Sequence, residues 1–600
     1  MGYDGEYRLN LYNELLSKIK DKNVIKKRLG LPLGSSNFKE VVSEYYYIDK
    51  TLLIKELLDI SAKVILFTRP RRFGKTLNMG MLRLFFEKND KEDTSVYFKH
   101  TDIWHAGEDY RRLQGQDIVI YMTFKDVKDI TWDEALEQIK NIISKAYDDY
   151  NELADSNKLT ERECSYFKRI LYGDASAAEW KQSLRSLSDF LFKHYGSNVV
   201  ILIDEYDIPI LQGYSHGFYD EVIAFMRVWL SAGLKDNDSL KLGVLSGVMQ
   251  VAKESIFSGM NNLYVSSVLD DRFGKFFGFT TYEVRRMLEH YNLEEKMYEV
   301  TEWYNGYTFG NTRIYNPWSV INYIVHYATP GGYWNETGNS ELIGKLINAM
   351  DSNGKKELYI LLNGNPIRHI INQSISYKSI MLDTANVFSF LLMTGYLTFS
   401  NIVRDCDGEL MCELYVPNKE IRTLYKREIV NYINHNCKGN NIDRLLTILK
   451  LGNTEELKSV IETYLKKTIS FFDASTEGFY HGFMLGLFAS FEVYYYITSN
   501  RESGLGRFDI QLEPKETGYP AVIIEIKSLS GDNINGLRED SNKLRDVLLR
   551  AAHEGLKQIK DNEYVTEMQD KGYRIYVIGV AFSGKQCEVA GEVYESTGST

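Results

Sequence analysis

Short apolar runs alternate with longer helical stretches between residue 40 and about residue 330. The runs have the length of buried strands, and the stretches between them have helical periodicity. Strands that alternate with helices in this way predict an α/β domain built on a mainly parallel sheet. The expected strands are Val64–Thr68, Ile118–Thr123, Val199–Ile203 and Leu240–Leu245.

The pattern becomes mostly helical from about residue 335 to 465. One hairpin is expected there, because Gly395–Ser400 and Leu410–Val416 flank the turn sequence DCDG. From about 470 to 590, a helix, paired strands, a long helix and a further strand at Ile575–Phe582 indicate a second α/β unit. At the other end of the chain, residues 9–29 fit an amphipathic helix that ends at Gly30 and Pro32.

The last turns of the N-terminal helix are rich in lysine and arginine. These cations either stabilise the carboxyl end of the helix dipole or form a patch for nucleic acid or a protein partner.

The hydrophobic and polar patterns also predict how the chain divides into segments. The expected segments are an N-terminal helix at 1–34, a large α/β domain with a helical lid at 35–330, a mostly helical connector at 331–468, a smaller α/β domain at 469–590 and a tail at 591–600.

Composition narrows the classes of protein that fit. Of the 600 residues, 44% are hydrophobic and 26% charged, so the chain can bury cores and is not disordered by composition. A net charge of -11 argues against a surface coated in positive charge for non-specific nucleic-acid binding, although local basic patches remain open. Without an apolar signal segment or a membrane-length apolar stretch, we expect a soluble, cytoplasmic protein with no membrane partner.

The cysteines are too scattered to form a disulfide framework or a zinc site, which indicates a reducing compartment. They are Cys164, Cys406, Cys412, Cys437 and Cys587.

The first chemical motif is the loop in KVILFTRPRRFGKTL, between the strand Val64–Thr68 and a helix that starts near Lys75. This is the context of a nucleotide-phosphate loop, in which Lys75 reaches the β- and γ-phosphates and the Thr76 hydroxyl binds Mg²⁺. Arg69 replaces the first glycine of the full Walker A pattern, so an ordinary strand–helix turn remains the alternative. The candidate nucleotide-binding residues are Arg69, Pro70, Arg71, Arg72, Phe73, Gly74, Lys75, Thr76 and Leu77.

A second motif, NVVILIDEYD, ends an apolar strand in two acids, as a Walker B strand does. Nucleotide hydrolysis needs one carboxylate near Mg²⁺ and a second that orients or deprotonates the attacking water. Asp204 fits the first role and Glu205 the second, and the alternative is that both merely cap the strand. Ser246, at the end of LKLGVLSGV, either senses the γ-phosphate or is an ordinary strand-end serine.

Together these segments resemble the AAA-ATPase-like family, whose members typically carry a PD-(D/E)XK nuclease domain at the C-terminus. The resemblance extends from about residue 33 to 585, through YYYIDKTLLIKELL, TRPRRFGKTLNMGML, VILIDEYDIPI, WYNGYTFG, IYNPWSV, TGYLT and VPNKE. The RPRRFGKT form, with arginine for the first glycine, is similar to the family's own pattern. The resemblance implies an AAA-like P-loop domain that uses ATP and Mg²⁺, and a restriction-endonuclease-like domain that acts on DNA rather than RNA. A homo-oligomer through the ATPase domain is a further expectation.

The third motif lies in two expected strands, GRFDIQL and AVIIEIK. A period of two places Asp509 on one face of the first strand, and Glu525 beside Lys527 on one face of the second. If the strands pair, Asp509 meets Glu525 across the ladder. The two carboxylates would bind one or two Mg²⁺ ions, or Mn²⁺, and Lys527 would orient or deprotonate the attacking water. A structural ion pair or a decayed site is the alternative.

Three further residues are candidates for supporting roles. Glu477 heads a helix before these strands and matches an acidic residue often found on the first helix of such nucleases, although an acid also suits any helix N-terminus. Gln558 matches a glutamine that some members place beside the metal. His481 is interpreted as a packed or hydrogen-bonding histidine rather than a ligand.

Charge tests the nuclease interpretation, because residues 471–600 hold 13 basic against 20 acidic residues. On a helix expected at about 540–562, Lys543, Arg550 and Lys557 share one face and Lys560 lies close to it. This basic stripe could hold a phosphate backbone, or it could be an ordinary solvated face. The buried face of the same helix is expected to carry Leu544, Leu548, Ala551 and Ile559.

Two functions from different classes fit these residues. The first is an ATP-binding and ATP-hydrolysing protein that controls a Mg²⁺-dependent DNA nuclease, with ATP gating cleavage, and with phage defence and mobile-element biology as equally ranked settings. The second is a nucleotide-dependent switch that binds a protein partner and cleaves nothing. Lys253 and Arg272 are candidates for a cation that acts in trans, but both are more typical of surface or ion-pair residues.

Overall fold

The structure, a computed structural model, divides the chain into two compact units, 1–337 with 368–421 and 338–367 with 422–600. The predicted helix at 9–29 and Lys253 lie outside the described residues, and the predicted segment boundaries stay a prediction. The described residues are 30–595 except 251–261, 335–343, 345, 347–349, 351, 363, 437–440, 469–476, 490, 492–493, 500–501, 504–505, 517, 530–540 and 563.

A parallel sheet forms the centre of the first unit, in the order β2-β3-β4-β1-β5. This confirms the predicted α/β class, and the four predicted strands agree with the observed ones to within two residues. The edge strand β5 was not predicted, because it is short and only half-buried. The strands are β1 Val64–Thr68, β2 Ile118–Thr123, β3 Val199–Asp204, β4 Leu240–Gly247 and β5 Leu263–Ser266.

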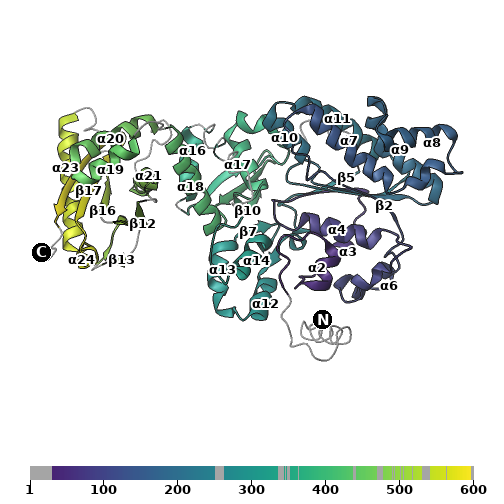
Figure 1. The fold of residues 1–600 in the computed structure, drawn as a ribbon, viewed down its shortest axis with the longest axis horizontal. Helices are drawn as coiled ribbons and strands as arrows, with labels where there is room; N and C mark the ends of the chain where they lie inside the picture. Colours follow the sequence, from purple (N-terminus) through teal and green to yellow (C-terminus); the bar gives the residue numbers. More distant parts are fainter. Residues whose placement is uncertain are drawn as a thin grey trace. The chain divides into compact units, whose positions relative to one another are not determined.

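Helices cover both faces of this sheet (Figure 1). Helix α4 packs on one face, and α7, α9 and α11 pack on the other. Strands β1 and β3 are buried along their whole length, which explains their unbroken apolar sequences. The helices of this part of the unit are α2 Phe38–Glu44, α3 Leu52–Leu58, α4 Lys75–Phe86, α5 Asp102–His105, α6 Glu108–Arg111, α7 Trp132–Asp148, α8 Glu161–Tyr172, α9 Ala177–Tyr195, α10 Ile208–His216 and α11 Tyr219–Leu234.

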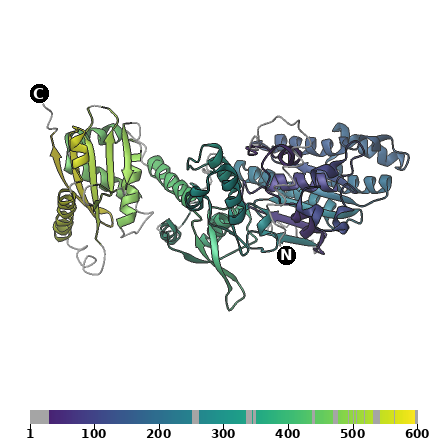
Figure 2. The same cartoon turned by 90° about the horizontal axis from the view of Figure 1, so that it is seen from below.

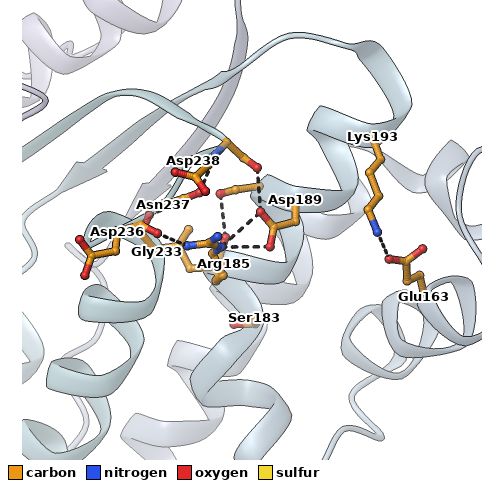
Figure 3. Close-up of polar contacts among 12 residues, drawn as sticks. Glu163, Ser183, Arg185, Asp189, Lys193, Gly233, Asp236, Asn237 and Asp238 are labelled. Carbon is orange, nitrogen blue, oxygen red and sulfur yellow. Dashed lines mark hydrogen bonds and ion pairs between the residues drawn. The ribbon is translucent and has the colours of Figure 1, made fainter.

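A polar cluster ties α9 to the turn between α11 and β4 (Figure 3). Arg185 pairs with Asp189 at 3.0 Å and also donates to the carbonyl of Asp236 at 2.7 Å. In the same turn the Asn237 side chain donates to the carbonyl of Gly233 at 2.7 Å. The cluster therefore fixes the amino-terminal end of β4, away from the end at which the predicted nucleotide residues lie.

Two small three-stranded sheets complete the first unit, in the orders β6-β8-β7 and β10-β11-β9. The pairing of β10 with β11 confirms the predicted hairpin around DCDG. The remaining elements of the unit are β6 Phe279–Thr280, α12 Thr281–Tyr291, α13 Met297–Tyr304, β7 Tyr307–Phe309, β8 Thr312–Tyr315, α14 Pro317–Val325, β9 Ile367–Ile370, α17 Thr384–Met393, β10 Thr398–Arg404 and β11 Leu410–Tyr415.

Glu420 is a fully buried carboxyl group in the first turn of α18, Lys419–Asn436. Its oxygens accept hydrogen bonds from the Ser319 hydroxyl at 2.9 and 3.1 Å and from the backbone N–H of Trp334 at 2.8 Å. Burial outweighs these bonds and raises the pKa of Glu420 from 4.5 to about 7.

This raised pKa makes the stability of the first unit depend on pH. Between pH 4.5 and 7 the folded state holds a proton that the unfolded state has lost, so stability falls as pH rises through this range. Glu420→Gln keeps an oxygen acceptor and removes the titration. We expect the variant to gain up to about 3 kcal/mol over the wild type between pH 5 and pH 8. Denaturant unfolding of both proteins at the two pH values measures this, and an equal difference at both values would contradict it.

A five-stranded mixed sheet forms the second unit, in the order β12-β15-β16-β17-β18. Strands β16 and β17 are parallel, and the other neighbours are antiparallel. Figure 2 shows these strands from a second side. The strands are β12 Tyr495–Ser499, β15 Ile510–Pro514, β16 Ala521–Ser528, β17 Ile575–Ser583 and β18 Gln586–Tyr594, and β13 Glu502–Ser503 with β14 Gly506–Arg507 form a separate pair.

Helix α23 lies on one face of this sheet and α21 on the other (Figure 1). Leu544, Leu548, Ala551 and Ile559 of α23 are buried in the core, as predicted. On the opposite face the ring of Tyr480 in α21 stacks on Phe582, with centroids 4.3 Å apart. The helices of the unit are α16 Ser352–Leu362, the later part of α18, α19 Asn441–Leu451, α20 Thr454–Thr468, α21 Glu477–Ala489, α23 Ser541–Asp561 and α24 Thr566–Asp570.

Among the described residues, no helix is both long enough and apolar enough to cross a membrane. Four of the five cysteines lie in the described part of the chain, and each is a free thiol: Cys164, Cys406, Cys412 and Cys587.

Candidate active sites

The carboxyl ends of three strands of the first unit, β1, β3 and β4, lie side by side in the parallel sheet. The register pairs Thr68 of β1 with Gly247 of β4, and Ile203 of β3 with Leu245 of β4, so Asp204 stands at the same edge. Ligands of open parallel sheets bind at the carboxyl ends of the strands. The residues predicted to bind nucleotide therefore gather at the end of the sheet where such a ligand would be expected.

Lys75 is the first residue of α4 and is 4% exposed. Its ammonium donates to the carbonyls of Arg69 and Pro70 at 3.2 and 3.3 Å, and it lies 3.3 Å from a carboxylate oxygen of Glu205. Gly74 precedes it with a φ of 84°, a left-handed conformation that suits glycine. The loop carbonyls thus bind the Lys75 ammonium and hold it close to Glu205, the residue that follows β3.

Asp204 ends β3 and is fully buried. One of its oxygens accepts a hydrogen bond from the Ser246 hydroxyl, and the carboxylate also accepts one from the Thr76 hydroxyl. Burial and the neighbouring Glu205 raise the pKa of Asp204, and these two hydrogen bonds and Lys75 oppose the rise. The structure therefore brings together four of the predicted residues, Lys75, Thr76, Asp204 and Ser246, with Glu205 beside them.

Glu205 follows the strand in a left-handed conformation, with a φ of 53°. Such a conformation is uncommon for a residue with a side chain, and strained backbone of this kind clusters at functional sites. The buried oxygens Asp204 Oδ2 and Glu205 Oε2 have no hydrogen-bond partner in the described structure. A buried carboxylate, Asp204, and a partly buried one, Glu205, each with an unused oxygen and beside a hydroxyl, fit the ligand preference of Mg²⁺, which binds oxygen donors.

Arg69 occupies a different place from the one expected of a phosphate-binding side chain. Its guanidinium is fully buried, donates to the carbonyl of Ser266 at 2.6 Å, and lies 4.9 and 5.3 Å from the ring centroids of Phe277 and Phe309. Burial lowers the pKa of Arg69 to about 9. The side chain links β1 to the unpredicted strand β5, so Arg69 offers the loop only its backbone.

The other loop residues divide between core and surface. Pro70 and Phe73 are buried, and the Phe73 ring contacts Tyr307 with centroids 4.9 Å apart. Arg71 is half-buried, while Arg72 is exposed and has a left-handed φ of 69°. Leu77 is half-buried in the first turn of α4. Arg71 and Arg72 are therefore the loop arginines whose side chains can reach a phosphate.

Sequence reasoning missed Asp207, three residues beyond Asp204. One of its oxygens accepts the backbone N–H groups of Val248 and Met249 at 2.8 and 3.0 Å, which fixes the turn after β4. Burial, and then the charge of Glu205, raises the pKa of Asp207 to about 6. The sequence did offer a signal for Asp207, because it is the third acid in IDEYD. An acid so close to the end of a buried strand needs hydrogen-bond donors.

In the second unit, Lys527 links two of the other predicted residues. Its ammonium lies 3.2 Å from a carboxylate oxygen of Glu525 and donates to the side-chain oxygen of Gln558 at 2.7 Å. Glu525 is 3% exposed and faces α23, where its side chain packs beside Gly555. Glu525 and Lys527 therefore share one face of β16, as predicted, and Gln558 reaches them from the helix that covers that face.

Asp509 lies one residue before β15 rather than on the ladder itself, which ends with Ile510 opposite Ile524. Its carboxylate accepts the backbone N–H of Ile526 at 2.8 Å. Asp509 is thus at the same end of β16 as Glu525 and Lys527, held by the strand's backbone and not by a ladder pair.

Helix α21 also reaches this end of the sheet. His481 makes a hydrogen bond with the backbone carbonyl of Asp509 at 3.0 Å, which agrees with its interpretation as a hydrogen-bonding histidine. Glu477 begins α21 one turn earlier, as predicted, and its side chain is outside the described part of the structure.

No cluster of three or more histidine, cysteine or acidic side chains suited to a metal ion is found among the described residues. The carboxylates of Asp509 and Glu525 nevertheless supply the oxygen donors that a hard cation prefers.

The predicted basic stripe is exposed along α23, at Lys543, Arg550, Lys557 and Lys560. Lys560 forms an ion pair with Glu592 of β18, and the neighbouring Arg545 pairs with Glu588 at 3.1 Å. Part of the positive charge of this helix is therefore offset by acids of the same unit. Contact of the stripe with nucleic acid remains a prediction.

Both groups of residues lie in segments that resemble known families. Residues 32–257 match a family model described as a predicted AAA-ATPase, and residues 475–592 match the model of the PD-(D/E)XK nuclease superfamily. The chain carries an AAA-ATPase-like domain and a PD-(D/E)XK nuclease superfamily domain. This confirms the resemblance inferred from the motifs.

One relative is similar along nearly the whole chain. It is an uncharacterized protein in the vnfD 5' region of Azotobacter chroococcum mcd 1, 25% identical over 578 residues, which cover 95% of this chain and 100% of the relative. The similarity therefore spans both matched segments of this chain, and the name of the relative assigns it no activity.

Arg272, a candidate for a cation acting in trans from the AAA-ATPase-like domain, pairs with Glu56 of α3 at 3.3 Å. It is about one-third exposed and has an acidic partner within its own chain. This agrees with the interpretation of Arg272 as an ordinary ion-pair residue.

Proposed function

We propose that the chain binds and hydrolyses ATP and thereby controls a Mg²⁺-dependent nuclease that acts on DNA. The strongest support is that two groups of predicted residues come together. Lys75, Thr76, Asp204, Glu205 and Ser246 lie at the carboxyl ends of the parallel strands, and Asp509, Glu525, Lys527 and Gln558 lie at one end of β16. The proposal includes a cytoplasmic location and a homo-oligomer formed through the AAA-ATPase-like domain. Phage defence and mobile-element biology are equally ranked settings for it.

In the ATPase half, the loop carbonyls of Arg69 and Pro70 hold the Lys75 ammonium toward Glu205. Incoming phosphate oxygens would compete for this ammonium and release Glu205 to orient the attacking water. Thr76 and Asp204 would hold Mg²⁺, which would neutralise charge that develops on the phosphates. Ser246, bonded to Asp204, keeps that carboxylate in place.

In the nuclease half, Asp509 and Glu525 would hold the metal, which would activate water and stabilise the phosphodiester during cleavage. Lys527 would orient or deprotonate that water, and Gln558 positions the Lys527 ammonium through the 2.7 Å hydrogen bond. Glu477, at the start of α21, would complete the site. The exposed stripe on α23 would bind the phosphate backbone, with an affinity that falls as salt rises.

Glu205→Gln tests the ATPase half. The change removes the charge and the basic oxygen of Glu205 but keeps its size, so ATP should still bind while hydrolysis slows by about 100-fold. Binding of ATP with Mg²⁺ and phosphate release by the same protein measure the two effects separately. Unchanged hydrolysis would contradict the role given to Glu205, and lost binding would show that it holds the nucleotide instead.

A further inference from the structure

The phosphate loop holds a conformation that needs support from outside the loop. Arg72 has a φ of 69°, a left-handed backbone conformation that is usual for glycine and unusual for a residue with a side chain. Left-handed backbone is unfavourable for a residue with a side chain, so contacts with neighbouring residues must stabilise it. Loops of this class usually rely on extra glycines, and this one has only Gly74.

Two tryptophans hold this part of the loop. The Arg72 guanidinium lies over the Trp318 ring, 4.1 Å from its centroid, and the Trp334 indole N–H donates to the Arg71 carbonyl at 3.1 Å. A cation over an indole face is the strongest of the cation–π pairs. The two contacts fall on adjacent residues of the loop, where the left-handed turn occurs.

The tryptophans are themselves fixed by a second layer of bonds. The Trp318 indole N–H donates to the Tyr333 carbonyl at 3.0 Å, and the backbone N–H of Trp334 donates to Glu420 at 2.8 Å. Trp334 is 6% exposed and Glu420 is fully buried. We call Trp318, Trp334 and Glu420 the tryptophan clamp. All three lie outside the segments that match the two family models.

The clamp also has a defined place along the chain. Glu420 stands in the first turn of α18, and the residues of α18 from Arg422 onward belong to the second compact unit. Trp334, which contacts the phosphate loop, is thus joined by a hydrogen bond to the helix along which the chain passes from residue 421 of the first unit to residue 422 of the second.

We propose that Trp318 and Trp334 are positioning residues for the nucleotide, which hold the phosphate loop in its binding shape and respond when phosphate arrives. This inference rests on the proposed function of the loop as an ATP site. The Arg72 guanidinium is shared between the indole face and any phosphate in the loop, so bound nucleotide changes the surroundings of Trp318. By linkage, a weaker clamp lowers the affinity for nucleotide.

Trp334→Phe removes the indole N–H to Arg71 and keeps an aromatic ring. The Kd for ATP with Mg²⁺ is expected to rise about tenfold, the scale of one lost hydrogen bond, with a much smaller change in kcat at saturating ATP. Trp229→Phe is the matched control, because it removes an indole hydrogen bond of 3.0 Å between α11 and Ser183 of α9. It should leave both constants unchanged.

Fluorescence gives a second measurement that does not depend on Trp334. ATP with Mg²⁺ should change the tryptophan emission of the wild type, and Trp318→Phe should remove most of that change. Equal Kd values for the Trp334→Phe and Trp229→Phe proteins, or a full emission change in Trp318→Phe, would overturn the clamp while leaving the ATP site intact. A wild type that binds no ATP would overturn the proposed function and the clamp together.

Discussion

Glu525→Ala is expected to lower the rate of DNA cleavage by the full-length chain by about 100-fold or more, the scale of losing a group that stabilises charge in a reaction. Glu525 supplies one of the two carboxylates at this end of β16, and its oxygen also lies 3.2 Å from the Lys527 ammonium. The change would therefore remove one of the two proposed metal ligands, and it leaves Lys527 without its acidic neighbour. Loss of linear or plasmid DNA with Mg²⁺ or Mn²⁺ measures the effect, and Lys527→Ala should behave alike.

Glu588→Ala is the matched control for this result. Glu588 is another buried acid of the same sheet, 5% exposed, and it pairs with Lys458 at 2.6 Å and with Arg545 at 3.1 Å. Its loss should cost stability and leave the cleavage rate of folded protein near the wild-type value. Equal cleavage by the Glu525→Ala and Glu588→Ala proteins would refute the assignment of the nuclease site.

Lys75→Ala is expected to abolish ATP binding or turnover, with a loss of about 100-fold or more in kcat/KM. Lys75 is the one residue of the loop that contacts both the loop carbonyls and Glu205 among the described side chains. Its removal takes away the cation that would reach the phosphates and leaves the Glu205 carboxylate beside them. Phosphate release at several ATP concentrations measures the loss.

The control is a second buried lysine of the same unit. Lys50 is 8% exposed, pairs with Glu283 at 2.6 Å and donates to the Lys275 carbonyl at 2.8 Å. Lys50→Ala creates a comparable buried defect outside the candidate site, so it should lower the melting temperature and spare ATP turnover in the folded protein. If Lys75→Ala retains turnover, or if both variants lose it in parallel with their melting temperatures, Lys75 has no special role.

Much of the fold could be predicted from the sequence, because the informative elements carry strong local patterns. Strands buried on both faces, such as Val64–Thr68 and Ile575–Ser583, are nearly unbroken apolar runs. Helix α23 alternates buried and exposed residues at helical spacing, so its buried face could be assigned residue by residue. The short strands β5 and β9 have no such pattern, since their residues are only partly buried.

The candidate site residues could be predicted where they lie within a single strand or a single loop. Lys75, Asp204 and Glu525 stand at fixed offsets from strands, so their directions follow from the period of the backbone. The position of Arg69 could not be inferred in this way, because its partners Phe277 and Phe309 lie far along the chain. Long-range contacts of this kind leave no local trace in a sequence.

Trp318, Trp334 and Glu420 were missed for the same reason. No residue of these segments pointed to chemistry, and the link to the loop between β1 and α4 arises only when Trp334 packs against Arg71, 263 positions away, and against Glu420, 86 positions away. Only the fold connects the loop to the start of α18.

In the proposed function, nucleotide at the first site controls cleavage at the second. The most direct measurement is the rate of DNA loss by the purified full-length wild type with Mg²⁺, with and without ATP, beside the Lys75→Ala protein under the same conditions. We expect the wild-type rate to change when ATP is added and the Lys75→Ala rate not to respond. A wild type that hydrolyses ATP yet leaves DNA and RNA intact under every metal and nucleotide condition would contradict the account and favour a nucleotide-dependent switch that binds a protein partner.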